Sequence, residues 1–315
     1  MTLPLETPKQ SPAMNKIAEL EHYVGNTPLI EIRSLNPNKN VRVLAKLEWH
    51  QFGGSVKARA AYNIIRTALE NGDLYEGKSL LDATSGNTGI AYAIFCAVAG
   101  IDLTLCVPEN CSEERKQILK ALGANVVYTS PFETTDGAQR VAREMVASDP
   151  SAYFYADQYA NDANWLAHYH GTAVELWNQT REQITHFVSG LGTTGTFTGT
   201  GTRLLEFNPN IELIGLQPDS ALHGMEGWKH LETAHIPGIY NDKLAHRFLE
   251  VDTMEAYDMI QQVARHEGLL ISPSSAANLV GALKVAENLD TGTVVTVFPD
   301  DASKYGALTS QLFNL

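Results

Sequence analysis

A lysine at the start of a predicted helix is the residue with the clearest chemical potential. Lys57 stands in the run GGSVKAR at positions 53–59. Apolar residues follow it at helical spacing, Ser55 is a suitable N-cap, and Gly72 is a suitable C-terminal stop. In the first turn the helix dipole opposes protonation of an amine, and burial lowers its pKa further. The position favours a nucleophilic amine, although most lysines near a helix start are ordinary surface residues.

The first glycine loop, TSGNTG at positions 84–89, presents hydroxyl, amide and backbone N–H groups at a predicted helix N-terminus. It follows a predicted strand at 79–83 and opens an apolar helix that ends at Gly100. Such a turn binds anions. Because it carries no charged side chain, it suits a carboxylate that must be oriented yet remain free to move. The alternative is a capped strand-to-helix turn without a ligand.

The second glycine loop, GLGTTGT at positions 190–196, follows a predicted strand at 184–188 and opens a predicted helix at 196–206. It matches the dinucleotide pattern GxGxxG, and Asp219 lies roughly where a ribose-binding acid is expected, so NAD is an alternative ligand. However, a dinucleotide pyrophosphate needs the close approach that glycines permit. Three threonines suit a terminal phosphate monoester better, and Asp219 lies beyond Pro218. The loop therefore favours a phosphate monoester.

Together, these three features combine a reactive amine, a carboxylate site and a phosphate site. An amine that forms a Schiff base beside a phosphorylated cofactor and an amino-acid carboxylate is typical of pyridoxal phosphate chemistry.

The elements that position these loops alternate between strand and helix. This alternation predicts an α/β fold of two Rossmann-like lobes with mostly parallel sheets and a cleft between them. Ligands of such sheets bind at the carboxyl ends of the strands, where both glycine loops fall. The remaining predicted strands are 103–107, 125–128, 211–216 and 293–298, and the remaining helices start near 112 or cover 138–146, 254–266 and 276–287.

The composition argues against several classes of binding partner and against a membrane protein. The 315 residues carry 23 basic and 36 acidic side chains, so the net charge is 23 − 36 = −13, without a basic block. Nucleic acid and anionic membrane are therefore unexpected partners. No apolar run is long enough to span a bilayer, which predicts a soluble protein. Residues 1–14 are predicted to form a disordered extension.

The cysteines and histidines give no metal or disulfide signal. Cys96, Cys106 and Cys111 lack both metal-ligand spacing and the density of a disulfide scaffold. Cys96 lies in an apolar helical run and Cys106 in a strand-like one, which favours buried free thiols in a reducing cytoplasm. His168 and His170 lie two residues apart on a predicted helix and do not share a face. No metal site is expected.

The motifs resemble those of the fold-type II pyridoxal-phosphate enzymes, whose fold is tryptophan-synthase-β-like, and within them the cysteine synthases (O-acetylserine sulfhydrylases). The resemblance extends from GNTPL at 25–29 almost to the C-terminus. It includes GGSVKAR, where the family usually reads SVKDR, TSGNTGIA at 84–91, GLGTTGT, and Pro-Ser-Ser at 273–275. The GTTGT form, GLQP at 215–218 and IPGIY at 236–240 are closer to the B-type (CysM-like) synthases than to the A type.

The resemblance implies a role for each matching residue. Lys57 would hold pyridoxal phosphate and move the α-proton, and Asn87 would bind the ring hydroxyl. Ser274 would meet the pyridine nitrogen; a hydroxyl leaves the ring a weaker electron sink than an aspartate does, which favours loss of a β-substituent. The phosphate group would be bound by Gly192, Thr193, Thr194, Gly195 and Thr196. The substrate carboxylate would be bound by Thr84, Ser85, Gly86, Thr88 and Gln158.

The activity implied is β-replacement that forms L-cysteine from O-acetyl-L-serine and sulfide through an α-aminoacrylate. Alternatives that keep the cofactor are an O-phosphoserine-dependent synthase, a cystathionine β-synthase-like enzyme, a cysteine desulfhydrase and a serine or threonine dehydratase. Residues 222–229 differ from common A-type sequences, and this stretch resembles the family's segment that faces the incoming substrate. The identity of the donor and of the nucleophile therefore stays open. A cofactor-bearing protein that only binds partners is disfavoured, because it has no need of all three sites.

The resemblance also predicts a domain division and an assembly. A small, mobile domain would cover residues 46–151, and a large phosphate-binding domain would cover 15–45 plus 152–315. The protein is expected to be a cytoplasmic homodimer.

Overall fold

The large lobe is built on a six-stranded sheet with the order β1-β2-β10-β7-β8-β9. Neighbouring strands are parallel except for the antiparallel pair β1–β2. Strand β10 lies in the middle of the sheet, between β2 and β7, although it comes last in the chain. The strands are β1 (Leu29–Glu31), β2 (Val41–Leu47), β7 (His186–Gly190), β8 (Glu212–Pro218), β9 (Arg247–Val251) and β10 (Gly292–Phe298).

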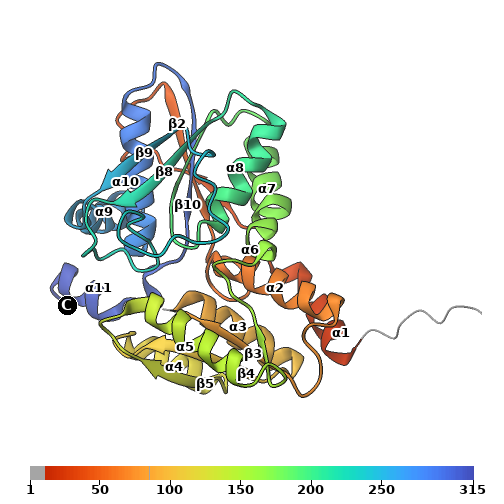
Figure 1. Cartoon of the computed structure of the whole chain (residues 1–315). Helices are drawn as coiled ribbons and strands as arrows, with labels where there is room; N and C mark the ends of the chain where they lie inside the picture. Colours follow the sequence, from red (N-terminus) through yellow and green to blue (C-terminus); the bar gives the residue numbers. More distant parts are fainter. Residues whose placement is uncertain (1–10, 85) are drawn as a thin grey trace, which may run out of the picture.

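Helices cover both faces of this sheet, as expected for a parallel sheet buried on two sides. One apolar core contains buried residues of α9 (Thr253–His266) and α10 (Pro273–Glu287). A second core contains residues of α7 (Ala173–Gln179) and α8 (Gly195–Phe207). Figure 1 shows α7 and α8 on one side of the strands and α9 and α10 on the other. The sheet thus holds its glycine loop between helices at a fixed strand end.

The small lobe is built on a four-stranded parallel sheet with the order β5-β4-β3-β6. Its apolar cores lie on either side of this sheet. In Figure 1 this lobe lies below the large one, and α2 lies between them. The elements are β3 (Ser79–Ala83), β4 (Leu103–Pro108), β5 (Asn125–Thr129), β6 (Tyr153–Tyr155), α1 (Pro12–Glu19), α2 (Lys57–Asn71), α3 (Asn87–Ala99), α4 (Glu113–Ala121), α5 (Thr134–Ser148) and α6 (Asp162–Ala167).

The computed structural model describes residues 11–84 and 86–315. Four short elements complete it, namely the single helical turns η1 (Glu21–Tyr23), η2 (His168–Thr172) and η3 (Ala302–Lys304) and the helix α11 (Gly306–Phe313). The predicted α/β fold with two lobes and mostly parallel sheets is confirmed. Within the described residues, no helix has the length and apolar character that crossing a membrane requires.

The N-terminal segment differs from its prediction. Residues 1–10 of the expected disordered extension lie outside the described part. For residues 12–14 the prediction is wrong, because α1 begins at Pro12, where the Ser11 hydroxyl accepts a hydrogen bond from the Met14 amide. Ile17 is fully buried in the small-lobe core. A proline at the first helical turn and a serine cap are sequence signals that this helix shares with α10.

The sheets do not coincide with the edges of the predicted domains, 46–151 and 15–45 plus 152–315. Lys46 and Leu47 belong to β2 of the large sheet, and β6 at 153–155 belongs to the small sheet. Helix α1 packs against α2 and α3. The segments at these edges therefore pair with the lobe opposite to the one expected.

Candidate active site

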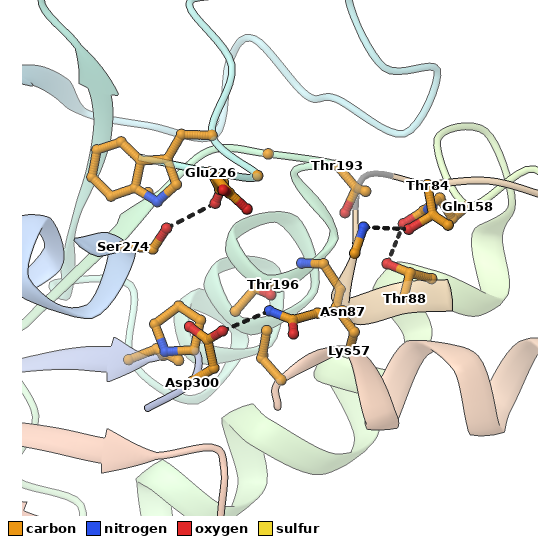
Figure 2. A pocket seen from close by; sticks show the side chains of 18 of the residues that line it. Lys57, Thr84, Asn87, Thr88, Gln158, Thr193, Thr196, Glu226, Ser274 and Asp300 are labelled. Atoms are coloured by element: carbon orange, nitrogen blue, oxygen red, sulfur yellow. Dashed lines mark hydrogen bonds between the residues drawn. The ribbon is translucent and has the colours of Figure 1, made fainter. Parts of the chain in front are cut away.

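A cavity between the lobes collects nearly all the predicted site residues (Figure 2). It lies at the carboxyl ends of β3, β7 and β10, and its empty space is about 850 Å³ including the part open to solvent. Ser85 lies outside the described residues, and Gly195 does not line the cavity. The predicted residues that do are Lys57, Thr84, Gly86, Asn87, Thr88, Gln158, Gly192, Thr193, Thr194, Thr196 and Ser274.

Lys57 is the first residue of α2, and its side chain lines the cavity. The expected cap is one residue out of place: Val56 occupies the cap position, while the Ser55 Oγ accepts a hydrogen bond of 3.3 Å from the Lys57 amide. The Val56 amide donates to the Pro299 carbonyl at 2.8 Å, which ties the start of α2 to the end of β10. Burial lowers the pKa of the Lys57 amine, and the nearby Asp300 carboxylate opposes this shift only in part. The neutral fraction of this amine at a given pH is therefore larger than that of an exposed lysine.

The threonine hydroxyls of the first glycine loop are paired within the protein. The Thr84 hydroxyl accepts hydrogen bonds from the Gly86 amide at 3.1 Å and the Gly89 amide at 3.2 Å. The Thr88 hydroxyl donates to Gln158 Oε1 at 2.7 Å, and Gln158 Nε2 donates to the Ala83 carbonyl at 2.8 Å. Figure 2 shows Thr84, Thr88 and Gln158 gathered at one side of the cavity. These groups can exchange partners when a carboxylate arrives.

Asn87 connects the first glycine loop to the end of β10. Its Nδ2 donates to Asp300 Oδ2 at 2.8 Å, and the Tyr305 hydroxyl donates to the same oxygen at 3.1 Å. Asn87 Oδ1 and Asp300 Oδ1 are buried, and neither has a hydrogen-bond partner among the described residues. Because buried polar groups are normally paired, these two oxygens indicate a polar ligand in the cavity.

The second glycine loop forms a cup at the N-terminus of α8. Thr194 adopts the left-handed conformation with φ 70°, which turns the chain into the helix. Asn164 Nδ2 donates to the Thr193 hydroxyl at 3.2 Å, whereas the buried Thr194 hydroxyl has no partner within the described structure. At Gly192 an added Cβ would overlap the Gly227 carbonyl oxygen. A helix N-terminus lined by hydroxyls suits a phosphate group, so these residues fit a phosphorylated cofactor.

The role of Gly195 is one of close packing. As the first residue of α8 it lies so near Asn164 that a Cβ would overlap the Asn164 amide. Thr196 lines the cavity, and its hydroxyl lies 3.3 Å from His168 Nε2. Burial, together with Arg59 and Lys57, holds the pKa of His168 well below its usual value, so this imidazole is neutral.

Ser274 lies in the first turn of α10, whose cap is the Ser272 hydroxyl. The Ser274 hydroxyl lines the cavity and donates to the Glu226 carbonyl at 2.9 Å (Figure 2). A hydrogen bond from Ser274 to a pyridine nitrogen requires this proton to turn away from Glu226.

Arg115 and Tyr305 line the cavity although the sequence reasoning did not select them. Arg115 forms an ion pair with Glu226, and its guanidinium carbon lies 5.0 Å from the centre of the Tyr305 ring. Arg115 follows β4, so the rule that ligands bind at the carboxyl ends of strands could have indicated it. Tyr305 follows β10 by several residues and carries no comparable local signal.

A larger hollow adjoins the cavity at its mouth, with an empty space of about 1520 Å³ that includes open solvent. Arg115, Tyr159, Glu226, Gly227 and Trp228 line both spaces. Inside the hollow, Lys229 Nζ lies 2.9 Å from Asp136 Oδ1. This ion pair joins the 219–229 segment of the large lobe to the start of α5 in the small lobe.

The three cysteines are free thiols that differ in how deeply they are buried. Cys96 and Cys106 are buried free thiols as predicted, and burial raises their pKa, that of Cys106 to about 11. Cys111 is only partly buried. In residues 11–84 and 86–315, no three His, Cys, Asp or Glu side chains gather in a way that could hold a metal ion.

Comparison with known proteins identifies the class. The family model described as "pyridoxal-phosphate dependent enzyme" matches residues 20–300, so the chain belongs to this family and its cofactor is pyridoxal phosphate. The dinucleotide alternative is wrong. Asp219, its expected ribose-binding acid, is exposed after β8 and does not line the cavity.

Individual relatives narrow the class to the cysteine synthases. Cysteine synthase of Aquifex aeolicus is 46% identical over 298 residues, which covers 92% of this chain and 90% of the relative. Cysteine synthase B of Escherichia coli K12 is 36% identical, with 92% of this chain and 94% of the relative covered. The crystal structure of cysteine synthase from Entamoeba histolytica matches with a TM-score of 0.87 at 30% identity, covering 100% of this chain and 95% of that one.

Proposed function

We propose that this protein forms L-cysteine from O-acetyl-L-serine and sulfide by β-replacement. In this reaction the Cβ–O bond of the donor breaks, acetate leaves with the bonding electrons, and sulfide forms the new Cβ–S bond. The observation that carries the proposal is that Lys57, both glycine loops and Ser274 surround one cavity. The cysteine synthases among the relatives support the same reaction.

The cofactor would be held by residues from both lobes. When bound, pyridoxal phosphate supplies an aldehyde that condenses with amines and a ring that acidifies the substrate Cα. We assign its phosphate to the second glycine loop, where the Thr194 hydroxyl and the α8 N-terminus offer donors. We assign Asn87, held by Asp300, to the ring hydroxyl.

Lys57 would serve as nucleophile and base. Its lowered pKa increases the fraction of neutral amine near pH 7, and only the neutral form can attack a carbonyl carbon or accept a proton at Nζ. Its four-carbon side chain can rotate, so Nζ can act as a nucleophile in one step and as a base in another. Its backbone stays fixed by Ser55 and, through Val56, by Pro299.

The first glycine loop would hold the substrate carboxylate. Thr84, Gly86, Thr88 and Gln158 line the cavity together, and Ser85 belongs to the same proposed set. Ser274 would meet the pyridine nitrogen. A serine hydroxyl carries no negative charge, so it does not hold this nitrogen protonated, and loss of a β-substituent is favoured over transamination.

The proposal also covers the location of the protein, its assembly and the movement of its lobes. We expect a cytoplasmic homodimer, which sedimentation velocity of the purified protein tests. We also expect the small lobe to close on the large one when donor binds, which a smaller radius of gyration in X-ray scattering would reveal.

The test is product analysis with paired donors and nucleophiles. O-acetylserine with sulfide should yield cysteine, and the visible absorbance band of the bound cofactor should change on adding O-acetylserine and return on adding sulfide. The matched control is Lys57→Ala, which should lower the rate by at least about 10²- to 10⁴-fold, the range for a lost proton-transfer group. Cysteine formation from O-phosphoserine alone, or full activity of Lys57→Ala, would contradict the proposal.

A further inference from the structure

A buried cluster of charged side chains lies beside the first turn of α2 and outside the cavity. Lys46 and Glu48 are fully buried, and Arg59 is almost so. None of these residues lines the cavity, so the proposed function gives them no role. Burying charges costs free energy unless every one of them is paired and hydrogen-bonded. The contacts of the cluster therefore indicate what it stabilises.

Glu48 is the centre of these contacts. Its Oε1 accepts hydrogen bonds from the Thr27 hydroxyl at 2.7 Å and from Arg59 Nη2 at 2.9 Å. Its Oε2 accepts from Arg59 Nε at 2.6 Å and from Gln51 Nε2 at 2.8 Å. We call these four residues, Thr27, Glu48, Gln51 and Arg59, the Glu48 cluster. Four donors converge on one carboxylate, which fixes its position within the large lobe.

The Glu48 cluster holds the chain on both sides of Lys57. On the N-terminal side, Gln51 Nε2 also donates to the Ser55 carbonyl at 3.1 Å, and the Ser55 hydroxyl accepts from the Lys57 amide. On the C-terminal side, Arg59 follows Lys57 by two residues and binds Glu48 through two of its nitrogens. The backbone of Lys57 is thus tied to a single carboxylate from both directions.

The other edge of Arg59 anchors α2 to the large lobe. Arg59 Nη1 and Nη2 donate to the two oxygens of Glu175 in α7 at 2.7 and 2.8 Å. Burial opposes its charge, but Glu48 and Glu175 raise the pKa of Arg59, so the guanidinium stays charged. A lysine has no planar fork and could not bind two carboxylates in this way. Meanwhile Ile64 and Ile65 of α2 pack in the small-lobe core.

We propose that the Glu48 cluster positions the Lys57 amine for attack on the cofactor aldehyde, with Glu48 as the central positioning residue. This inference rests on the proposed function of Lys57. A lysine side chain is flexible, so only a fixed backbone can keep its amine within attack distance of the aldehyde carbon. A misplacement of about 1 Å can slow a reaction about a hundredfold.

The experiment separates the position of Lys57 from the integrity of the cofactor site. The apoprotein of Glu48→Gln is mixed with pyridoxal phosphate, and imine formation is followed by absorbance. The same apoprotein is titrated with 4′-deoxypyridoxine 5′-phosphate, which lacks the aldehyde and binds without Lys57. We expect imine formation to slow about tenfold or more, while the dissociation constant of the deoxy analogue changes less than about twofold.

Lys46→Met is the matched control. Lys46 is fully buried, and this variant loses its 2.7 Å ion pair with Glu175 and its 3.0 Å hydrogen bond to the Thr27 carbonyl. Among the described residues, Lys46 makes no hydrogen bond to the side chains of Glu48, Gln51 or Arg59. Its thermal midpoint should fall as that of Glu48→Gln does, because a buried ion pair is broken in both. Its rate of imine formation should stay within about twofold of wild type, since all four hydrogen bonds to the Glu48 carboxylate are kept.

A milder variant keeps the test decisive if Glu48→Gln does not fold. Gln51→Met removes the tie between Glu48 and the Ser55 carbonyl but leaves both bonds from Arg59 to Glu48, and it should also slow imine formation. An unchanged rate in either folded variant, or equal slowing in Lys46→Met, would overturn the inference. Failure of the proposed function would look different, because wild-type protein would then form no imine or no cysteine.

Discussion

The two glycine loops lie at equivalent places in their lobes, each between a parallel strand and a helix, but they differ in how their threonine hydroxyls are paired. In the first loop, Thr84 and Thr88 already have partners in Gly86, Gly89 and Gln158. In the second, the buried Thr194 hydroxyl has no partner within the described structure, and Gly192 lies directly against a backbone carbonyl. Threonine hydroxyls that are paired within the protein can release a ligand and pair again, whereas the Thr194 hydroxyl gains a partner only when a ligand is bound.

This difference matches the two proposed ligands. A substrate carboxylate arrives and leaves in every turnover, so its site must be stable when empty. A cofactor phosphate stays bound, so its site can be built for the occupied state. If the two loops differ in this way, substitutions in or near them should have unequal effects on cofactor binding and on stability.

The largest expected effect comes from adding a methyl group at one glycine of each loop. In Gly192→Ala the new Cβ overlaps the backbone of Gly227, which cannot move aside, and we expect about a hundredfold weaker pyridoxal phosphate binding, or ~3 kcal/mol. In Gly86→Ala the Cβ meets the Arg115 side chain instead, 2.7 Å from Nε. Because that side chain can shift, cofactor affinity should change less than about threefold while KM for the donor rises. Fluorescence titration and steady-state kinetics measure both, and equal loss of cofactor affinity would remove the distinction.

A smaller effect is expected from replacing one hydroxyl in each loop by a methyl group of the same shape. Thr194→Val should weaken pyridoxal phosphate binding about tenfold, since a hydrogen bond to a charged group is lost, without loss of apoprotein stability. Thr88→Val should leave cofactor affinity unchanged but lower the free energy of unfolding by ~1 kcal/mol, because Gln158 Oε1 loses its donor. Cofactor titration measures the two affinities, and urea denaturation of the apoproteins measures the two free energies of unfolding. If Thr194→Val destabilised the apoprotein as Thr88→Val does, the second loop would not have an unpaired hydroxyl.

The smallest effect concerns pH and the strands that lead to the loops. Asp82 of β3 is fully buried near the first loop, and burial raises its pKa to about 7. The second loop follows β7, where the residue next to the loop is the uncharged Ser189. Since the folded pKa lies above the unfolded value of about 3.9, the folded state holds the proton more tightly. The free energy of unfolding therefore falls as pH rises from about 4 to about 7 and is level above. Relative to wild type, Asp82→Asn should gain about 1 kcal/mol in urea denaturation between pH 6 and pH 8, and a gap that is constant with pH would contradict this.

The sequence predicted the elements around both loops well because their signals are local. The strand at 79–83 appears as predicted, and the helices that end at Gly72 and Gly100 do so with these glycines in the left-handed conformation. The threonines and glycines of both loops could be selected for the same reason. Where a contact joins distant residues, the sequence carried less information: Asn87 and Asp300, for example, are 213 positions apart.

Strand β2 illustrates why other parts escaped prediction. Its sequence VRVLAKL was not selected as a strand, and Lys46 within it suggests an exposed position. In the folded protein this lysine is fully buried because Glu175, from a helix much later in the chain, neutralises it. No sequence pattern near Lys46 predicts that Glu175 is its partner. The Glu48 cluster was missed for the same physical reason.

The central place of β10 in the large sheet constrains the order in which the protein can be built on the ribosome. The four strands of the small sheet all come from residues 79–155, so this sheet can form while later residues are still being synthesised. The large sheet cannot be continuous until β10, residues 292–298, has entered between β2 and β7. Lys57 is among the early residues to be made, yet its backbone support from Pro299 arrives near the end. A nascent chain therefore carries its reactive lysine for most of its synthesis without a complete site around it.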